Sequence, residues 1–451
     1  MTYYIITFGC QMNLSDSEKI KAILDSNGFI ETKDRDMSDI IVINTCSVRE
    51  SAENRVFGLA ENLSNLKQKN NKPFIVVTGC MPGRDTNNEI RKKFKNKIDL
   101  FIKINDIEKL PIFIYEYFGG KHTEENINLY RTDIQDDLRN IDYINIKSEN
   151  KSKFEAFIPI ITGCNNFCSY CVVPFTRGRE VSRDPFSIIE EVKELKNKGY
   201  KQITLLGQNV NSYNPDNLKY VSKDNPYKHK FAQLLWEINK IGIDRIYFTS
   251  SHPKDIDDEV IDALNLEHMG NYLHLAVQSG DNNILKLMNR HYTKEEYLDK
   301  ISKIRKIKPD IAIGTDIIVG FPGETEEAFN ETIDLYKKAD FDIAYISIYS
   351  DRSGTASIKM NNKIRFDIKK KRWNTLHDLM EEIVLKKNQK YINNMVKVLV
   401  EEYDNKKRMY IGHSSEQKVV KFKSDSNDLI GKIVDIKIYK VEEWNLYGRE
   451  V

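Results

Sequence analysis

The sequence predicts an α/β protein of three domains: a parallel α/β N-terminal domain, a partial TIM-like (β/α)6 barrel, and a small C-terminal β-barrel. Three observations predict this fold class. Short apolar runs alternate with helical patterns over residues 1–118, the same alternation recurs six times from residue 154 onward, and residues 395–451 change to a period of two. A chain of 451 residues is long enough for two or three domains, each with its own core.

The first domain begins with three β-rich runs, and each run stops shortly before a cysteine. The runs cover residues 3–8, 39–44 and 74–78, and the cysteines are Cys10, Cys46 and Cys80. Helical patterns follow each run, and Ser15 with Glu18 forms a capping box that predicts the start of the first helix. Alternation of this kind predicts a parallel sheet with right-handed crossovers.

These three cysteines are expected to meet at one edge of that sheet. They are separated by 36 and 34 residues, about the length of one βαβ unit each. Ligands of parallel sheets gather beyond the carboxyl ends of the strands. The sequence therefore predicts a site with three thiolates. The alternative is that three core cysteines happen to end three strands.

The remaining three cysteines lie in one short segment, Cys164-Asn165-Asn166-Phe167-Cys168-Ser169-Tyr170-Cys171. Zinc would need a fourth ligand nearby, and the nearest histidine, His229, is far downstream. Iron–sulfur cubanes usually take four cysteines, so three leave one iron free to bind a group that is not protein. A zinc knuckle and an accidental cluster of cysteines are the alternatives.

A partial barrel is predicted for the middle of the chain, with its chemistry at the carboxyl ends of the strands. Strands are expected at 154–162, 202–206, 245–249, 272–277, 312–319 and 343–348, with helices such as 187–198 and 231–241 between them. Polar loops follow the strands, and they supply three candidate cofactor-binding residues, Gln208, Asn209 and Gln278. Asp316 is a fourth, because a carboxylate buried inside an apolar strand needs a partner such as a ribose hydroxyl or a backbone amide.

The domain limits follow from changes in pattern. We expect the N-terminal domain over 1–118, a linker over 119–150 that contains Gly119-Gly120-Lys121-His122, the barrel domain over 151–384, and the last domain over 385–451. A basic helix at 369–394 closes the barrel domain.

The last domain is predicted to be a small antiparallel barrel, because alternating residues are separated by turns about every ten residues. Its lysines lie among four aromatic residues, Tyr410, Phe422, Tyr439 and Trp444. Lysines beside aromatic rings can hold phosphate and stack bases. The alternative is an ordinary solvated face.

Composition narrows the class of protein. With 69 basic and 67 acidic side chains the net charge is only +2, so nucleic-acid affinity would have to come from local patches. The sequence has no secretion signal and no apolar run long enough for a membrane span. We therefore expect a cytoplasmic protein, in which cysteines serve metal binding or catalysis rather than disulfides.

The cysteine motif, with Tyr170 before its last cysteine, resembles the signature of radical S-adenosylmethionine enzymes. With the N-terminal cysteines added, the whole chain resembles the methylthiotransferase family, which has a three-cysteine domain, a radical domain and a C-terminal TRAM module. Three segments are similar to the tRNA-modifying branch: Gly9-Cys10-Gln11-Met12-Asn13, Val172-Val173-Pro174-Phe175-Thr176-Arg177-Gly178-Arg179-Glu180 and Leu206-Gly207-Gln208-Asn209-Val210-Asn211.

The resemblance implies two 4Fe–4S clusters and S-adenosylmethionine, with the six cysteines as metal ligands and no further catalytic residue assigned. One cluster makes a radical and the other supplies a methylthio group to C2 of N6-isopentenyladenosine beside the anticodon. The implied partners are a tRNA anticodon stem-loop and a flavodoxin-like electron donor, and the protein is expected to be a monomer. Alternatives are methylthiolation of a ribosomal-protein aspartate or of threonylcarbamoyl-adenosine, and an RNA-binding protein with structural metals.

Overall fold

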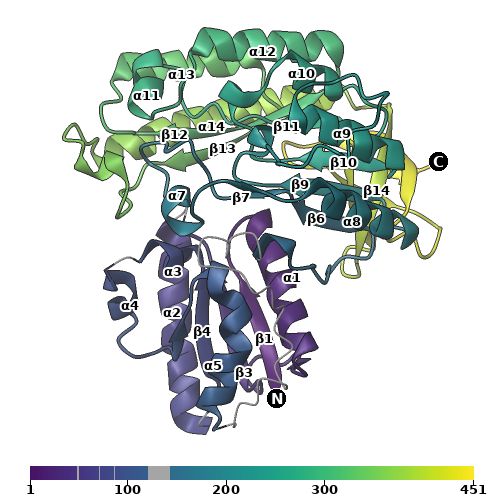
Figure 1. Cartoon of the computed structure of the whole chain (residues 1–451). Helices are drawn as coiled ribbons and strands as arrows, with labels where there is room; N and C mark the ends of the chain where they lie inside the picture. Colours follow the sequence, from purple (N-terminus) through teal and green to yellow (C-terminus); the bar gives the residue numbers. More distant parts are fainter. Residues whose placement is uncertain (48–49, 71, 86, 120–142) are drawn as a thin grey trace.

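The computed structural model describes residues 1–47, 50–70, 72–85, 87–119 and 143–451, so the predicted linker residues Gly120, Lys121 and His122 lie outside it. An α/β domain lies beneath a larger barrel domain, and a small β-barrel packs at the side of the latter (Figure 1). Within the described ranges, no helix combines the length and the apolar character needed to cross a bilayer.

The N-terminal domain contains a parallel sheet, as predicted. It has five strands in the order β2-β1-β3-β4-β5, of which β2 and β5 were not among the predicted runs. Its strands are β1 (Thr2–Thr7), β2 (Ile30–Glu31), β3 (Ile40–Thr45), β4 (Phe74–Gly79) and β5 (Leu100–Phe101). Its helical elements are α1 (Gln11–Ser26), α2 (Glu50–Asn70), α3 (Cys80–Arg84), α4 (Glu89–Lys93), η1 (Ile104–Lys109) and α5 (Leu110–Tyr117).

Helices cover both faces of this sheet, so its central strands β3 and β4 are buried at every position, and the first four residues of each are all apolar rather than alternately so. Ile40 and Val42 of β3 pack with α1 and α5, while Ile41 and Ile43 pack with α2. Tyr143 belongs to the first of these cores although it lies within the predicted linker, 119–150. The end of that predicted linker therefore contributes to the core of the N-terminal domain.

The first helix begins earlier than the predicted capping box implied. Its N-cap is Cys10, and the Cys10 amide donates to Asn13 Oδ1 at 3.2 Å. The predicted box of Ser15 and Glu18 is wrong, because Ser15 is buried within the helix. Gly9 permits the abrupt turn from strand to helix: its φ is +133°, and a Cβ there would lie 2.1 Å from Asn13 Oδ1.

The barrel domain consists of two three-stranded parallel sheets, β10-β9-β6 and β11-β12-β13. The strands are β6 (Glu155–Pro159), β9 (Gln202–Leu206), β10 (Arg245–Phe248), β11 (Tyr272–His274), β12 (Ala312–Val319) and β13 (Ile343–Ile348). A parallel bridge between Ser251 and Leu275 joins the sheets. Among the described strands β6 and β13 do not pair with each other, which leaves the barrel open on one side as predicted.

The first predicted strand of this domain, 154–162, is divided. After β6 the chain forms β7 (Ile161–Thr162), which pairs antiparallel with β8 (Val181–Ser182). The hairpin-like pair encloses the cysteine motif and α7 (Val173–Thr176). The division therefore places that loop next to the N-terminal domain (Figure 1).

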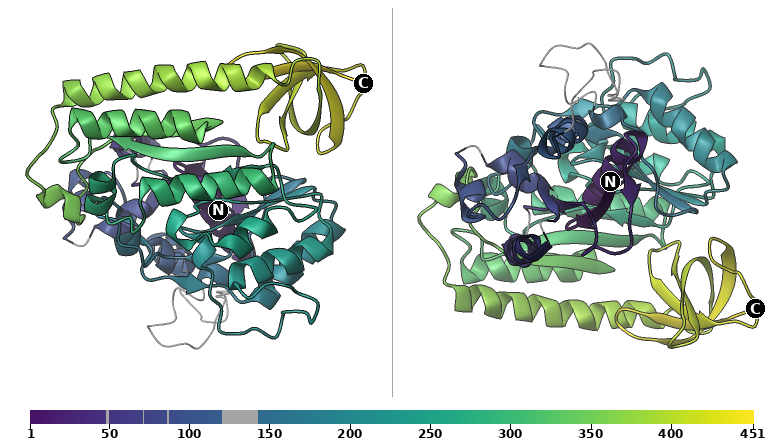
Figure 2. Two further views of the ribbon diagram at one scale, coloured as in Figure 1. Left: turned by 90° about the horizontal axis from the view of Figure 1, so that it is seen from above. Right: turned by 90° about the horizontal axis from the view of Figure 1, so that it is seen from below.

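Helices surround the outside of the open barrel: α8 (Pro185–Asn197), α9 (Lys230–Ile241), α10 (Asp258–Ala263), α11 (Asn282–Leu287), α12 (Lys294–Ile307), α13 (Glu326–Ala339) and α14 (Phe366–Gln389). Short 3-10 turns are η4 (Val210–Ser212), η5 (Pro253–Asp255) and η6 (Ala356–Lys359). The last helix, predicted at 369–394, buries Leu376, Met380 and Val384. It runs along the domain and leads into the C-terminal barrel (Figure 2).

The C-terminal barrel is closed in the order β14-β15-β16-β18-β17. Its strands are β14 (Met395–Asp404), β15 (Met409–Ser414), β16 (Val419–Lys423), β17 (Ile433–Val441) and β18 (Leu446–Glu450). Two sequence expectations are wrong. Because β16 and β18 pair in parallel, the barrel is not wholly antiparallel. Tyr410 and Phe422 belong to its core, whereas Tyr439 and Trp444 are exposed.

Buried charges dock this barrel on the middle domain. The Arg245 guanidinium donates to the carbonyl oxygens of Lys397 at 2.7 Å and His413 at 3.0 Å. Asp342 is 3% exposed. Its carboxylate lies 3.0 Å from Lys387 Nζ of α14 and 3.5 Å from Nζ of Lys418, the residue just before β16. Paired charges at this boundary hold the two domains in a fixed orientation.

Candidate metal and cofactor site

The structure brings Cys10, Cys46 and Cys80 to the carboxyl edge of the N-terminal sheet. Register pairs Thr7 with Asn44 and Asn44 with Thr78, so the three strands end side by side. Each cysteine follows its strand within three residues. A Cβ on Gly9 would lie 2.9 Å from Cys46 Cβ, which shows how closely the first two loops approach.

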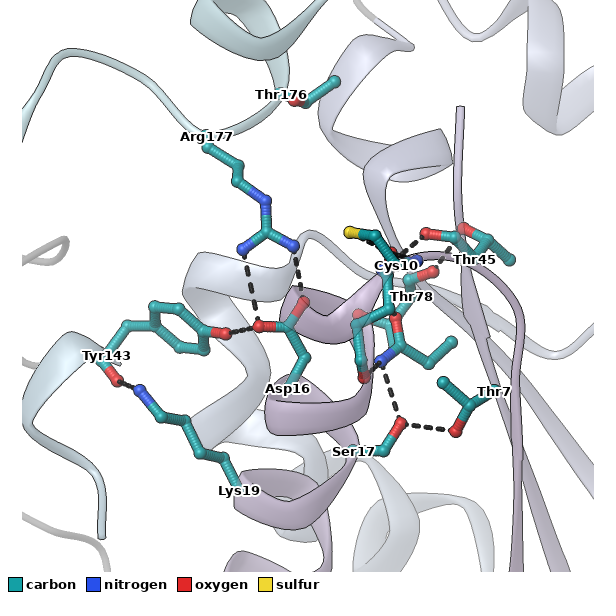
Figure 3. A network of polar contacts seen from close by, with 12 residues as sticks. Thr7, Cys10, Asp16, Ser17, Lys19, Thr45, Thr78, Tyr143, Thr176 and Arg177 are labelled. Carbon is teal, nitrogen blue, oxygen red and sulfur yellow. Dashed lines mark hydrogen bonds and ion pairs between the residues drawn. The ribbon is translucent and has the colours of Figure 1, made fainter. Parts of the chain in front are cut away.

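A network of amides and hydroxyls fixes these loops (Figure 3). The Asn13 side-chain amide donates to Thr45 O at 3.1 Å, and Asn44 Nδ2 donates to Asn13 O at 2.8 Å. Thr45 Oγ1 donates to Thr78 O at 2.5 Å and so links the second loop to the third. Side chains between the cysteines thus set their mutual positions.

Burial and one arginine define the electrostatics of this edge. Burial raises the pKa of the Cys80 thiol, whereas the positive charge of Arg177 acts to lower it. Cys46 and Cys80 are buried, while Cys10 is exposed. A buried thiol of this kind becomes a thiolate when a metal supplies the compensating charge.

The second cysteine loop follows β7 and is held by backbone bonds and by an arginine. Cys164 N donates to Gly178 O at 3.2 Å, and Ser169 N donates to Met288 O at 3.0 Å. The buried Arg290 donates from Nη1 to Cys168 Sγ at 3.4 Å. Burial, with the neighbouring thiols, raises the pKa of Cys164 to about 11 and that of Cys171 to about 12.

The spacing of the sulfur atoms bears on the kind of metal. Among the described residues, only the side chains of His377, Asp378 and Glu381 place three potential ligand atoms within 4.8 Å of one another. Neither cysteine set is contracted around a single ion, as a structural zinc site would be. Each set instead supplies three cysteines, the usual ligands of iron–sulfur clusters, so the chemistry of the donor sets fits such clusters.

Two cavities adjoin the cysteines. The smaller one, about 210 Å³, is lined by two of the predicted cofactor residues, Gln278 and Asp316, by Cys171, and by Ser47, Tyr170 and Arg352. The larger one, about 730 Å³, extends from Cys10 past the open side of the barrel to the C-terminal barrel; its lining includes Phe157, His274, Tyr345, His413 and Trp444. A polar atom without a described partner, Ser47 Oγ, is buried at the smaller cavity.

Asp316 lies between these two cavities. The sequence led us to expect a buried carboxylate, but its side chain is 42% exposed because it faces the smaller cavity. Asp316 Oδ2 is 3.4 Å from Nε2 of His274, whose ring lines the larger cavity. Nothing in the local sequence pattern indicates that these two residues are partners.

Gln208 and Asn209 lie apart from Gln278 and Asp316. Asn209 is buried and donates to Asp255 Oδ2 at 2.7 Å. Gln208 Oε1 is buried without a described partner, but neither residue lines the two cavities above. The four predicted cofactor residues therefore form two groups.

Comparisons with known families match each domain in turn. Residues 2–102 match the "Uncharacterized protein family UPF0004", residues 158–336 match the Radical SAM superfamily, and residues 389–451 match the TRAM domain. A tRNA-2-methylthio-N(6)-dimethylallyladenosine synthase of Caldicellulosiruptor saccharolyticus is 43% identical, covering 100% of this chain and 92% of the relative. One of Clostridium botulinum is 42% identical, covering 100% of this chain and 97% of the relative.

The chain belongs to the tRNA-2-methylthio-N(6)-dimethylallyladenosine synthase family. Membership in this family confirms the resemblance drawn from the cysteine motifs, and makes the protein a radical S-adenosylmethionine enzyme with methylthiotransferase activity. S-adenosylmethionine and a 4Fe–4S cluster follow from the superfamily.

A solved structure supports the fold alone. The radical S-adenosylmethionine methyltransferase TsrM of Kitasatospora setae, with cobalamin and a [4Fe-4S] cluster bound, superposes with a TM-score of 0.56 at 14% identity. The match covers 79% of this chain and 73% of that one.

Sequence reasoning missed two arginines of this family member, Arg290 and Arg177. Arg290 meets Cys168 across 122 residues of chain, and Arg177 meets Asp16 across 161. Arg177 lies within the 172–180 segment that resembles the tRNA-modifying branch. That resemblance indicated that the segment matters, but it did not indicate that Asp16 is the partner of Arg177.

Proposed function

We propose that this protein replaces the C2 hydrogen of N6-isopentenyladenosine in tRNA, next to the anticodon, with a methylthio group. One observation carries the proposal: two sets of three cysteines lie on either side of the contact between α3 and α7, in a chain 43% identical to synthases named for this product. Modification of a ribosomal-protein aspartate or of threonylcarbamoyl-adenosine is not favoured, nor is an RNA-binding protein with structural metals.

We infer two clusters. Cys164, Cys168 and Cys171 would hold the one that binds S-adenosylmethionine, and Cys10, Cys46 and Cys80 would hold the second. When bound, these groups supply a carbon radical and the sulfur that is transferred, which general base catalysis could not replace because the C2 hydrogen is barely acidic. The buried Arg290 would orient Cys168, and the burial of Cys164 and Cys168 would limit the access of water to the radical chemistry.

The candidate residues would bind the cofactor in two groups. Gln278 and Asp316 line the small cavity beside Cys171, where polar groups can hold the ribose and the methionine portion. The unpartnered oxygens of Gln208 and Asn209 are available to a second part of the same molecule. Each of the four is proposed as a cofactor contact.

The tRNA anticodon stem-loop would enter by the open side of the barrel, because the large cavity there reaches from Cys10 to the exposed Trp444. We further propose a flavodoxin-like electron donor, a monomeric state and a cytoplasmic location. The domains would extend over 1–118, 151–384 and 385–451, and the 119–150 segment between the first two would supply Tyr143 and Ile146 to the core of the first.

Metal analysis tests the two-cluster proposal. The wild-type protein, reconstituted without oxygen, should hold about eight irons per chain, and Cys10→Ala and Cys164→Ala should each remove about half. Nucleoside mass spectrometry of tRNA from a deletion strain should show loss of the 2-methylthio group with the isopentenyl group retained. Unchanged tRNA, or about four irons in the wild type, would contradict the proposal.

A further inference from the structure

One buried arginine lies between the two cysteine sites. Arg177 is the C-cap of α7, six residues after Cys171, and is 3% exposed. Its guanidinium donates to both carboxylate oxygens of Asp16, Nη2 to Oδ2 at 2.5 Å and Nη1 to Oδ1 at 3.4 Å (Figure 3). Asp16 lies on α1, six residues after Cys10. The pair therefore joins a residue near one cysteine set to a residue near the other.

The carboxylate is itself fixed from the opposite side. Tyr143 donates its hydroxyl to Asp16 Oδ1, and the buried Lys19 ammonium donates to the carbonyl oxygens of Tyr143 at 3.0 Å and Ile144 at 3.1 Å. Tyr143 and Lys19 are both about 1% exposed. Because Asp16 has partners on two sides, its position does not depend on Arg177 alone.

The backbones of α3 and α7 meet at the same place. A Cβ on Gly83 would lie 2.5 Å from Thr176 O, next in sequence to Arg177. The helix that carries Gly83 begins at Cys80. Shifts of α7 against the N-terminal domain would therefore move Arg177 and Cys80 relative to each other.

Arg177 also places its positive charge near the N-terminal cysteines. The residue before it, Thr176, lies against Gly83 of the helix that begins at Cys80. The Arg177 guanidinium is held by Asp16 of the helix whose N-cap is Cys10. A fixed cation beside an iron–sulfur cluster favours its more negative, reduced form.

We propose that Arg177 is a positioning residue that sets the separation of the two cysteine sites and places a positive charge beside the N-terminal one. This inference rests on the proposed second cluster. One residue can do both, because a guanidinium that binds a carboxylate through two nitrogens holds a fixed orientation and also carries a permanent positive charge. In the reaction, correct separation determines whether each radical is used for methylthio transfer or is lost.

Charge variants test the electrostatic duty, in full-length protein whose Cys164, Cys168 and Cys171 are alanine so that only the N-terminal cluster remains. We expect Arg177→Gln to lower the midpoint potential of that cluster, and Asp16→Asn to raise it. Arg177→Lys should leave it near the wild-type value because the charge is retained. A purely structural role would not produce shifts of opposite sign.

The positioning duty is measured in the enzyme with all six cysteines, as the ratio of 5′-deoxyadenosine formed to methylthiolated tRNA. Arg177→Lys and Asp16→Asn should raise this ratio by about 10- to 100-fold, since misplacement by about 1 Å costs that much. The matched control is Arg183→Lys. Arg183 Nη1 forms a buried ion pair with Glu191 Oε2 at 2.5 Å inside the barrel domain, so this substitution should leave the ratio unchanged.

The proposal is overturned if the potential stays at the wild-type value in Arg177→Gln and Asp16→Asn and the ratio stays there in Arg177→Lys and Asp16→Asn, or if Arg183→Lys changes the ratio as much as these variants do. Failure of the proposed function has a different result. In that case the wild-type protein itself would hold only about four irons per chain, with no N-terminal cluster for Arg177 to influence.

Discussion

Gly83 of α3 lies directly against Thr176 of α7, so that a side chain on Gly83 would meet backbone atoms of the other domain at 2.5 and 2.9 Å. The contact leaves no room for even a methyl group. It brings the segments that begin at Cys80 and end just before Arg177 into contact.

Substituting Gly83 by alanine should therefore separate the two helices. We expect a loss of about 1–3 kcal/mol in the free energy of unfolding, as for other overpacked sites, and a fall in methylthio transfer. Thermal unfolding and tRNA nucleoside analysis measure the two effects. Gly58→Ala is the control: a Cβ at Gly58 of α2 meets nothing within 4 Å and should stabilise that helix. Equal effects of the two substitutions would contradict the prediction.

Lys19 gives the stability a pH dependence. Burial lowers the pKa of Lys19 to about 7 in the folded protein, whereas an unfolded lysine titrates near 10.4. Between about pH 7 and 10 the unfolded chain binds more protons, so stability rises with pH, by up to about 1.4 kcal/mol per pH unit. Urea unfolding at pH 7 and pH 9 should show this rise in the wild type and a smaller one in Lys19→Met.

The control for Lys19 is Lys21→Met on the same helix. Lys21 is partly exposed and pairs with Asp25 at 2.6 Å. Its hydrogen bonds to acidic groups outweigh burial and raise its pKa, so it does not lose its proton in this window. An undiminished rise in Lys19→Met would show that another group is responsible.

Asp342 should hold the C-terminal barrel in place. Asp342→Asn leaves the ammonium groups of Lys387 and Lys418 without their shared buried carboxylate. Breaking a buried ion pair typically costs about 3–5 kcal/mol, so we expect lower unfolding midpoints and faster proteolysis near residue 389. Asp435→Asn, whose pair with Lys397 is exposed, should cost less than about 1 kcal/mol. Similar proteolysis of both variants would disprove this role.

Trp444 should contact tRNA, whereas Phe422 should not. Trp444 is 42% exposed at the large cavity, and Phe422 is fully buried in the barrel core. Trp444→Ala should weaken tRNA binding by about 1–3 kcal/mol without changing the unfolding midpoint. Phe422→Ala should cost about 3–5 kcal/mol of stability. Filter binding and calorimetry distinguish them, and unchanged tRNA affinity in Trp444→Ala would exclude a stacking role.

The sequence was sufficient to predict most of the strands. β12 (Ala312–Val319) and β13 (Ile343–Ile348) have the predicted limits, because each is a mostly apolar run that begins and ends with apolar residues. The convergence of Cys10, Cys46 and Cys80 at the sheet edge followed from the same regularity. The limits of strands and the place of residues at their ends can therefore be read from the local pattern of apolar residues.

Side-chain partners could not be predicted in the same way. In the C-terminal barrel the alternation is visible, but period two alone does not tell which set of residues faces inward, so Phe422 was misplaced. The exposure of Asp316 depends on the cavity it faces, which other strands create. Arg177 and Arg290 meet their partners only through the packing of distant segments.

The placement of Tyr143 and Ile146 in the first hydrophobic core affects how a ribosome could deliver this protein. Domains tend to fold as units during synthesis. Here the core of the N-terminal domain stays incomplete until Tyr143 and Ile146, well past the end of α5, have emerged from the exit tunnel. An N-terminal fragment prepared for separate study should accordingly extend at least to residue 146, since truncation at 118 would leave a hole in its centre.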